Sequence, residues 1–210
     1  MFSLTEPLKD TVLIRGEEVL VDFSFDTVLL WYQILEAQDI SSEDKIIIAF
    51  DNFIEKEFVP CLSLEEKVEI IDLISEYIKS SAYGNIADSA KENLEGTTTE
   101  NINNQFFSYT QDAGAIYASF LYDYGIDLNL ERGRLHYDQF KSLLEGLSDK
   151  SYFKRIIAIR QASPTEYEGQ ALTHLLEAQE YYCLDSQRTV NNLDNQMGDI
   201  FSMLKAQAEK

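Results

Sequence analysis

The stretch Ser63–Ile78, SLEEKVEIIDLISEYI, decides the fold class of this chain. It opens with a capping box, in which Ser63 and Glu66 are spaced to satisfy each other's free backbone amides at the start of a helix. Apolar residues follow at steps of three and four, at Val68, Ile71, Ile74 and Ile78. This spacing predicts an amphipathic helix with one apolar face.

Helical signals recur on both sides of this stretch. On its N-terminal side, Asp26 and Ser41 are placed to cap two further helices. On its C-terminal side, the helical runs are residues 111–124, about 135–147 and 152–161. The sequence therefore predicts a mainly α fold, a multi-helix bundle.

The segment before these helices is predicted to form a small β-hairpin. Thr11–Arg15 and Val19–Phe23 are β-prone runs on either side of Gly16-Glu17-Glu18. A loop of that length joins antiparallel strands. Because an isolated hairpin is only marginally stable, we expect this one to lie against the helices.

The C-terminal part begins with the clearest helix start in the chain. Ser163-Pro164-Thr165-Glu166 combines a capping box with proline at the first helical position. No proline follows, so we predict a long C-terminal helix, which runs on toward Lys210 or bends back near residues 185–195. The predicted domains are a helical domain, residues 1–162, with a flexible insertion near 80–105, and a C-terminal helical extension, residues 163–210.

Composition excludes several classes of partner. The chain has 210 residues, 45% of them apolar, and carries a formal charge of -20. Such a charge repels nucleic-acid phosphates and acidic membrane surfaces, so neither is expected as a partner. It either keeps the protein soluble or forms an acidic face that imitates DNA. No apolar run approaches a membrane span, and the two cysteines, Cys61 and Cys183, fit a reducing cytosol.

No catalytic or metal-binding motif is present in the sequence. Neither His136 nor His174 has a neighbour at metal-ligand spacing. Residues 127–138 have the wrong residue at the sixth position of a calcium loop, where Arg132 replaces the required glycine. We therefore expect a binding protein without a cofactor, and not an enzyme.

Apolar stripes near the C-terminus are the predicted partner-binding residues. Val190, Leu193, Met197, Ile200 and Leu204 follow a 3-4-3-4 spacing that Phe201 widens, and Leu172, Leu175 and Leu176 form a second strip. Such stripes either pack on their own domain or bind a helix or groove of a partner.

A basic segment in the acidic chain is the predicted self-association site. Residues 132–160 contain seven basic and three acidic residues. These basic residues either pair with acidic helices of the same chain or support head-to-tail self-association into a homo-oligomer. The residues assigned to self-association are Arg132, Arg134, Lys154 and Arg155.

Residues 111–129, QDAGAIYASFLYDYGIDLN, and 135–160, LHYDQFKSLLEGLSDKSYFKRIIAIR, resemble a known phage family. This family is the tail-assembly chaperones of siphophages that infect Gram-positive bacteria, encoded beside the tape-measure gene. The resemblance extends more weakly to the hairpin and to the helices that begin near Asp26 and Ser41. Residues 80–104 and those after 161 depart from the compact family pattern.

The resemblance implies a function in virion morphogenesis. A chaperone of this kind binds and solubilises the long, apolar tape-measure protein during tail assembly, until tail-tube subunits displace it. Two alternatives remain open at this point. One is an acidic inhibitor that imitates DNA and occupies a host protein, and the other is a structural subunit retained in the tail.

Overall fold

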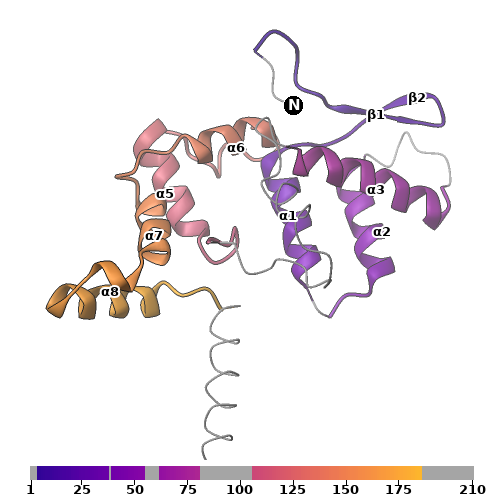
Figure 1. The fold of residues 1–210 in the computed structure, drawn as a ribbon. Helices are drawn as coiled ribbons and strands as arrows, with labels where there is room; N and C mark the ends of the chain where they lie inside the picture. The colour runs from indigo at the N-terminus through magenta and orange to yellow at the C-terminus, as the bar shows by residue number, and fades with distance from the viewer. Residues whose placement is uncertain (1–3, 38, 55–61, 81–105, 186–210) are drawn as a thin grey trace, which may run out of the picture. The chain divides into compact units, whose positions relative to one another are not determined.

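The structure, a computed structural model, describes residues 4–37, 39–54, 62–80 and 106–185 (Figure 1). The elements in chain order are β1 (Thr11–Ile14), β2 (Glu17–Leu20), α1 (Phe25–Glu36), α2 (Ser42–Phe53), α3 (Leu64–Lys79), α5 (Ala113–Tyr124), α6 (Tyr137–Glu145), α7 (Tyr152–Gln161), the 3-10 turn η4 (Pro164–Glu166) and α8 (Gly169–Tyr181). The predicted mainly α fold with an N-terminal hairpin is therefore confirmed. Within the described residues, no helix is long and apolar enough to cross a membrane.

The chain divides into two compact units at positions that the sequence does not mark. The first unit comprises residues 1–100 and 124–147, and the second comprises residues 101–123 and 148–210. The predicted boundary at 162/163 falls inside the second unit, because the helices on both sides of it pack together there. The predicted insertion near 80–105 lies almost entirely outside the described residues.

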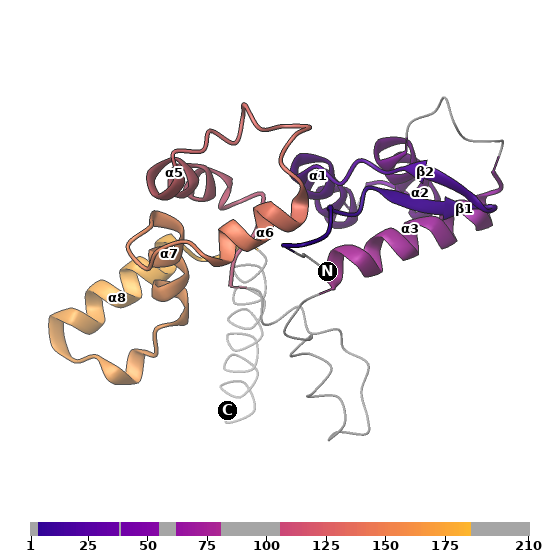
Figure 2. The same cartoon turned by 90° about the horizontal axis from the view of Figure 1, so that it is seen from above.

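The hairpin of the first unit is shifted from its predicted position. Arg15 and Gly16 form a two-residue loop with φ angles of 52° and 87°. Positive φ at both residues is the signature of a type I′ turn, whose twist matches that of the flanking strands. The loop is therefore Arg15-Gly16, one residue earlier than predicted, and β2 begins at Glu17. The hairpin lies along α3, to which Arg15 is joined by a 2.9 Å bond from its Nε to Glu66 Oε1 (Figures 1 and 2).

Helix α3 forms as its sequence predicts, with one correction. The Ser63 amide donates to Glu66 Oε2 at 2.8 Å, and the Glu66 amide donates to Ser63 Oγ at 3.3 Å, so the capping box is present. The buried face carries Ile70, Ile71, Ile74 and Ile78. Val68 was predicted on this face but is 41% exposed, because the buried stripe is centred on the isoleucines instead.

This capping box gives a prediction for the stability of the first unit. Ser63→Ala is expected to lower the free energy of unfolding by about 1 kcal/mol, because an amide at the start of α3 loses its acceptor. Urea denaturation followed by the fluorescence of Trp31, the one tryptophan of the chain, measures this loss. The matched control is Ser42→Ala, an exposed serine in the first turn of α2, one residue after the cap Ser41. Equal effects of the two substitutions would contradict the role of the box.

The same box has a pH dependence with a defined sign. The pKa of Glu66 is lowered, first by the hydrogen bond from the Ser63 amide and then by the Arg15 side chain. A lowered carboxyl pKa in the folded state adds stability above the unfolded-state pKa, and this stability is lost as the pH falls through the lowered value. The stability difference between the wild type and Glu66→Gln should therefore be present at neutral pH and shrink in acid.

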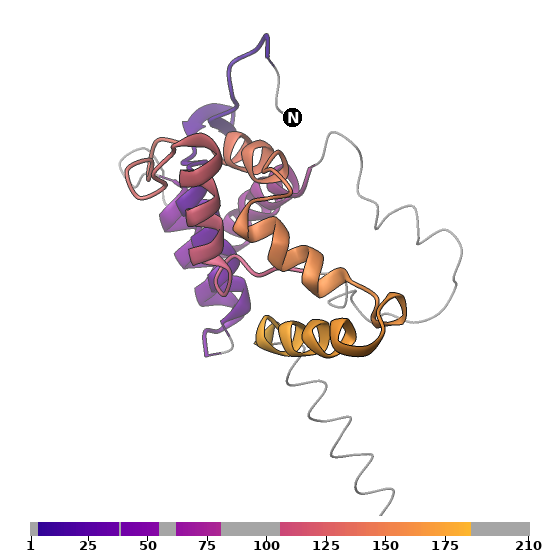
Figure 3. The same ribbon diagram turned by 90° about the vertical axis from the view of Figure 1, so that its left-hand side faces the viewer.

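The second unit is held together around α5 and α7. Ser119 is fully buried on α5, and its hydroxyl donates to the Ala115 carbonyl at 2.7 Å and accepts the Phe153 amide of α7 at 3.0 Å. The core of this unit is formed by Ile116, Phe120, Phe153, Ile156, Leu175 and Leu184. Figure 3 shows α8 lying across the end of α7, where the Gln179 side-chain amide donates to the Ile159 carbonyl at 3.0 Å.

The predicted helix start at Ser163 is wrong. The Ser163 side chain caps no amide and instead lies 2.7 Å from the Thr165 hydroxyl, so only one 3-10 turn, η4, forms. The chain is extended at Glu168, and α8 begins at Gly169 with a φ of 59°, a conformation that glycine adopts without strain. Helix α8 then ends at Tyr181. The rest of the predicted C-terminal helix, from residue 186, lies outside the described residues.

Candidate partner-binding surface

Three tyrosines of the second unit form a cluster where α7 begins and α8 ends. The ring centroids of Tyr152 and Tyr182 are 6.5 Å apart at 75°, and those of Tyr181 and Tyr182 are 4.8 Å apart at 90°. Both pairs meet edge to face, the arrangement that the charge distribution of aromatic rings favours. We call Tyr152, Tyr181 and Tyr182 the tyrosine cluster.

The backbone at the end of α8, which carries Tyr181 and Tyr182, is fixed by partly buried hydrogen bonds. Arg160 Nε donates to the Tyr182 carbonyl at 2.6 Å, so the residue that follows α8 is tied to the end of α7. The Gln179 side chain donates to the Ile159 and Ala162 carbonyls at 3.0 and 2.8 Å. A partner that binds here therefore meets rings whose backbone is already ordered, which lowers the entropy cost of binding.

The tyrosine cluster is open to solvent. Tyr181 is 75% exposed and Tyr152 is 42% exposed. The pKa of Tyr152 is raised, mainly by its hydrogen bond with the Tyr182 side chain and then by burial. Exposed tyrosines on a rigid support can cover an apolar partner and still bind water through their hydroxyl groups when no partner is present.

The structure separates the predicted apolar strip of α8 into an inner and an outer part. Leu175 is buried in the core of the second unit, whereas Leu172 is half-buried and Leu176 is 48% exposed. Leu176 is thus the most exposed residue of this strip. The remaining predicted residues lie outside the described residues; they are Val190, Leu193, Met197, Ile200, Phe201 and Leu204.

Sequence reasoning missed the tyrosine cluster. Tyr152 is separated from Tyr181 and Tyr182 by most of α7, by η4 and by α8, and no periodic pattern links them. A local signal was present, because adjacent residues of a helix point in different directions, so two neighbouring tyrosines place at least one ring toward solvent. That signal does not show which residue the exposed ring meets.

The basic residues predicted for self-association lie on both units. Arg132 and Arg134 are exposed in the loop before α6 of the first unit. On α7 of the second unit, Arg155 is exposed and Lys154 is half-buried. Arg160 shows the alternative of pairing within the chain, because it forms a salt bridge with Asp112 at 2.7 Å in which both side chains are 5% exposed.

Titratable side chains are scattered in the part of the chain that the structure describes. No three residues of the histidine, cysteine, aspartate and glutamate types gather there as they would around a metal ion. His136 has a structural role in the first unit, where its Nδ1 accepts the Asp138 amide at 3.1 Å and its Nε2 lies 3.1 Å from the Lys9 carbonyl. His174 is exposed and lies 3.6 Å from Glu177, one turn further along α8.

One comparison with known proteins gives a match that covers most of the chain. A family model described as "Bacteriophage Gp15 protein" matches residues 4–184. The match includes the hairpin and every helix in the part of the chain that the structure describes. No curated protein and no solved structure matches the chain.

Proposed function

The chain belongs to the Bacteriophage Gp15 protein family, and from this premise we propose that it is a tail-assembly chaperone. Its phage origin, which residues 111–160 indicated, is confirmed by the family. The proposed task is to bind the tape-measure protein in the host cytoplasm and to keep it soluble until tail-tube subunits displace it. The chain itself serves only as a binding partner in this proposal, without a cofactor or a catalytic step.

The observation that carries this proposal is the exposed tyrosine cluster. Tyrosine is enriched among the residues that dominate binding energy at protein interfaces, and so is arginine. Arg155 follows Tyr152 by about one turn of α7 and is exposed. Together with the exposed Leu176 of α8, these residues offer apolar area to the apolar face of a helical partner.

The charge of the chain supports the same function. A chaperone that coats an apolar protein must keep the complex in solution, and net charge of one sign opposes aggregation. The formal charge of -20 meets this need. Because the tyrosine cluster is small, each copy contributes modest affinity, and many copies along a long partner bind tightly yet exchange individually.

Self-association belongs to this proposal as well. A coat on a long helical protein requires neighbouring copies, and the basic residues Arg132, Arg134, Lys154 and Arg155 stand in an acidic chain. Head-to-tail contacts between unlike faces build rings or filaments. Light scattering of the purified protein measures its oligomeric state.

Co-expression tests the chaperone role. The tape-measure protein of the phage, expected to be a long helical protein, should be found mainly in the soluble fraction when this chain is present, and in the insoluble fraction when it is absent. The double variant Tyr152→Ala and Tyr181→Ala should weaken the complex roughly 30-fold or more, since two interface truncations at about 1 kcal/mol each cost about 2 kcal/mol together.

The matched control is Tyr122→Ala, which removes an aromatic side chain of the second unit that is 79% exposed and lies outside the tyrosine cluster. It should leave the soluble yield unchanged. If the long helical protein is no more soluble with the wild-type chain than without it, the proposal is refuted. Mass spectrometry of mature particles separates a chaperone, which should be absent, from a structural tail subunit, which should be present.

A further inference from the structure

The outer face of the hairpin in the first unit carries two exposed leucines. The strands pair antiparallel with Thr11 opposite Leu20 and Leu13 opposite Glu18, so Leu13 and Leu20 are diagonal neighbours on the same face. Leu13 is 66% exposed and Leu20 is 56% exposed. The opposite face is buried, with Ile14 and Val19 at 6% exposure each. This two-stranded sheet thus has one face packed on the unit and one face that presents Leu13 and Leu20, together with Thr11 and Glu18, to water.

The free edge of β1 adjoins this face. The Val21 amide donates to the Asp10 carbonyl at 2.8 Å, which makes Asp10 and Val21 a hydrogen-bonded pair of the ladder. Because such pairs alternate with non-bonded ones, Thr11 and Leu13 direct their N–H and C=O groups away from β2. Among the described residues, no backbone hydrogen bond from outside the hairpin reaches Thr11 or Leu13. The edge can therefore accept another strand.

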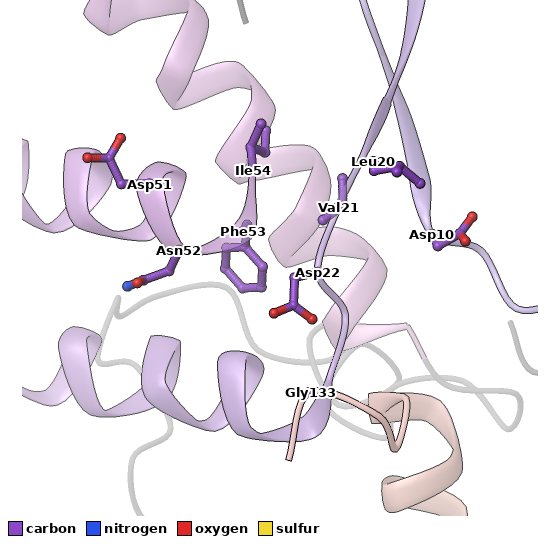
Figure 4. A pocket seen from close by; sticks show the side chains of 9 residues that line it. All are labelled: Asp10, Leu20, Val21, Asp22, Asp51, Asn52, Phe53, Ile54 and Gly133. Carbon is purple, nitrogen blue, oxygen red and sulfur yellow. The ribbon is translucent and has the colours of Figure 1, made fainter. Parts of the chain in front are cut away.

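An acidic hollow lies at the base of the hairpin, next to Leu20. It has a volume of about 420 Å³ and is lined by residues of the hairpin base, the end of α2 and the loop that carries Gly133 (Figure 4). Its apolar lining includes Leu20 and the buried side chains of Val21 and Phe53. Asp10, Asp22 and Asp51 also line it, and no basic residue does so within the described part of the chain.

We infer that this hairpin surface binds an extended segment of a partner protein as a third strand, and that the segment alternates apolar residues with lysine or arginine. Added strands of this kind bind through main-chain hydrogen bonds, and their side chains determine specificity. Apolar side chains on one side of the segment cover Leu13 and Leu20, and a basic side chain reaches the carboxylates of the hollow. The inference concerns the first unit only and does not depend on the chaperone function.

Two physical arguments select this occupant. A two-stranded hairpin is marginally stable alone, and a third strand gives the edge hydrogen bonds that it lacks while removing leucine surface from water. Charge complementarity then favours a basic segment over an acidic or neutral one. A second copy that pairs edge to edge with this hairpin is disfavoured, because it would bring its own Asp10 carboxylate next to the carboxylates of this surface.

A peptide probe tests the inference on the full chain. Fluorescence anisotropy compares a labelled peptide that alternates lysine and valine with a second peptide of the same composition, in which the lysines and valines are grouped in separate blocks. The alternating peptide is expected to bind at least roughly tenfold more tightly, a difference that net charge alone cannot produce. Equal affinities of the two peptides would overturn the inference, because attraction between opposite charges would then be enough to explain the binding.

Hydrogen exchange gives the readout specific to strand addition. The amides of Thr11 and Leu13 should become protected when the alternating peptide binds, and those of Val12 and Ile14, which face β2, should change little. Binding without protection at Thr11 and Leu13 would also overturn the inference, since the peptide would then occupy another surface.

Matched variants locate the site. The double variant Leu13→Asn and Leu20→Asn should weaken peptide binding roughly tenfold, whereas Leu73→Asn, on α3 of the same unit and 54% exposed, should not. Asp10→Asn should weaken binding at low salt more than Asp72→Asn, an exposed carboxylate of α3. Variants of the tyrosine cluster should leave peptide binding unchanged, so this inference and the chaperone function can fail separately.

Discussion

Arg160→Met is expected to lower the free energy of unfolding of the second unit by about 3–5 kcal/mol, the cost of removing one partner from a buried ion pair. The guanidinium donates to both carboxylate oxygens of Asp112, at 2.7 and 2.8 Å. It also donates to the Phe106 carbonyl at 2.9 Å and to the Tyr182 carbonyl at 2.6 Å. Methionine fills much of the same space but leaves these acceptors, one of them charged, without their donor.

The position of this pair explains why the expected effect is large. Asp112 precedes α5, Arg160 is in the last turn of α7, and Tyr182 follows α8, so one side chain joins three segments of the second unit. Asp112 also accepts the Ser108 amide at 3.0 Å, which ties the start of α5 to the same network. Loss of the guanidinium should therefore loosen the support of the tyrosine cluster as well as the core.

Circular dichroism during urea denaturation measures the loss, because it reports the helices of both units. Arg155→Met is the matched control, since Arg155 is exposed on the same helix, and its effect should stay within about 0.5 kcal/mol. The double variant Asp112→Leu and Arg160→Met should recover part of the loss, because it removes the stranded charge. If Arg160→Met lowers the free energy of unfolding by less than about 1 kcal/mol, the salt bridge between Arg160 and Asp112 does not stabilise the second unit as expected.

Phe140→Ala is expected to destabilise the first unit by about 3–5 kcal/mol, the range for removal of a buried phenylalanine. Phe140 is fully buried on α6, and its ring stacks on Phe25 of α1 with centroids 5.0 Å apart and planes at 17°. Its ring also lies 6.3 Å from that of Tyr137. Alanine would leave a cavity among these rings that the backbone of α1 and α6 cannot close without moving.

The fluorescence of Trp31 detects this loss, since Trp31 lies on α1 and is 5% exposed in the same unit. Leu130→Ala is the control, because Leu130 belongs to the first unit and is 71% exposed. Phe140→Ala should lower the urea midpoint of the Trp31 transition, while Arg160→Met should leave that midpoint nearly unchanged. If either variant shifts the urea midpoints of circular dichroism and of Trp31 fluorescence by the same amount, the two units unfold together.

Features governed by neighbouring residues could be predicted from the sequence. The capping box of Ser63 and Glu66, the bounds of α7 and the existence of the hairpin all depend on residues within a turn or two of one another. One prediction that was wrong, a helix start at Ser163, also concerned a local feature. At Ser163 a capping motif of the same type yields only a 3-10 turn, because the serine hydroxyl pairs with Thr165 and the chain extends to Gly169 before α8 begins.

The candidate surfaces depended on contacts between residues far apart in the chain. Periodicity places Leu172, Leu175 and Leu176 on one strip of a helix, but only packing against α7 shows that Leu175 faces inward and Leu176 outward. The contacts of Tyr152 with Tyr182 and of Arg160 with Asp112 also join separate elements, so spacing along one helix could not predict them.

The sequence by itself thus determined the helical class and the hairpin, because caps, turns and stripes are encoded within a few residues. Its resemblance to known proteins indicated a phage protein, which the family match supports. Tertiary structure alone decided the two units, the tyrosine cluster and the open hairpin edge. These features arise where side chains from separate elements compete for the same buried space, and spacing along one element cannot show which of them is left in water.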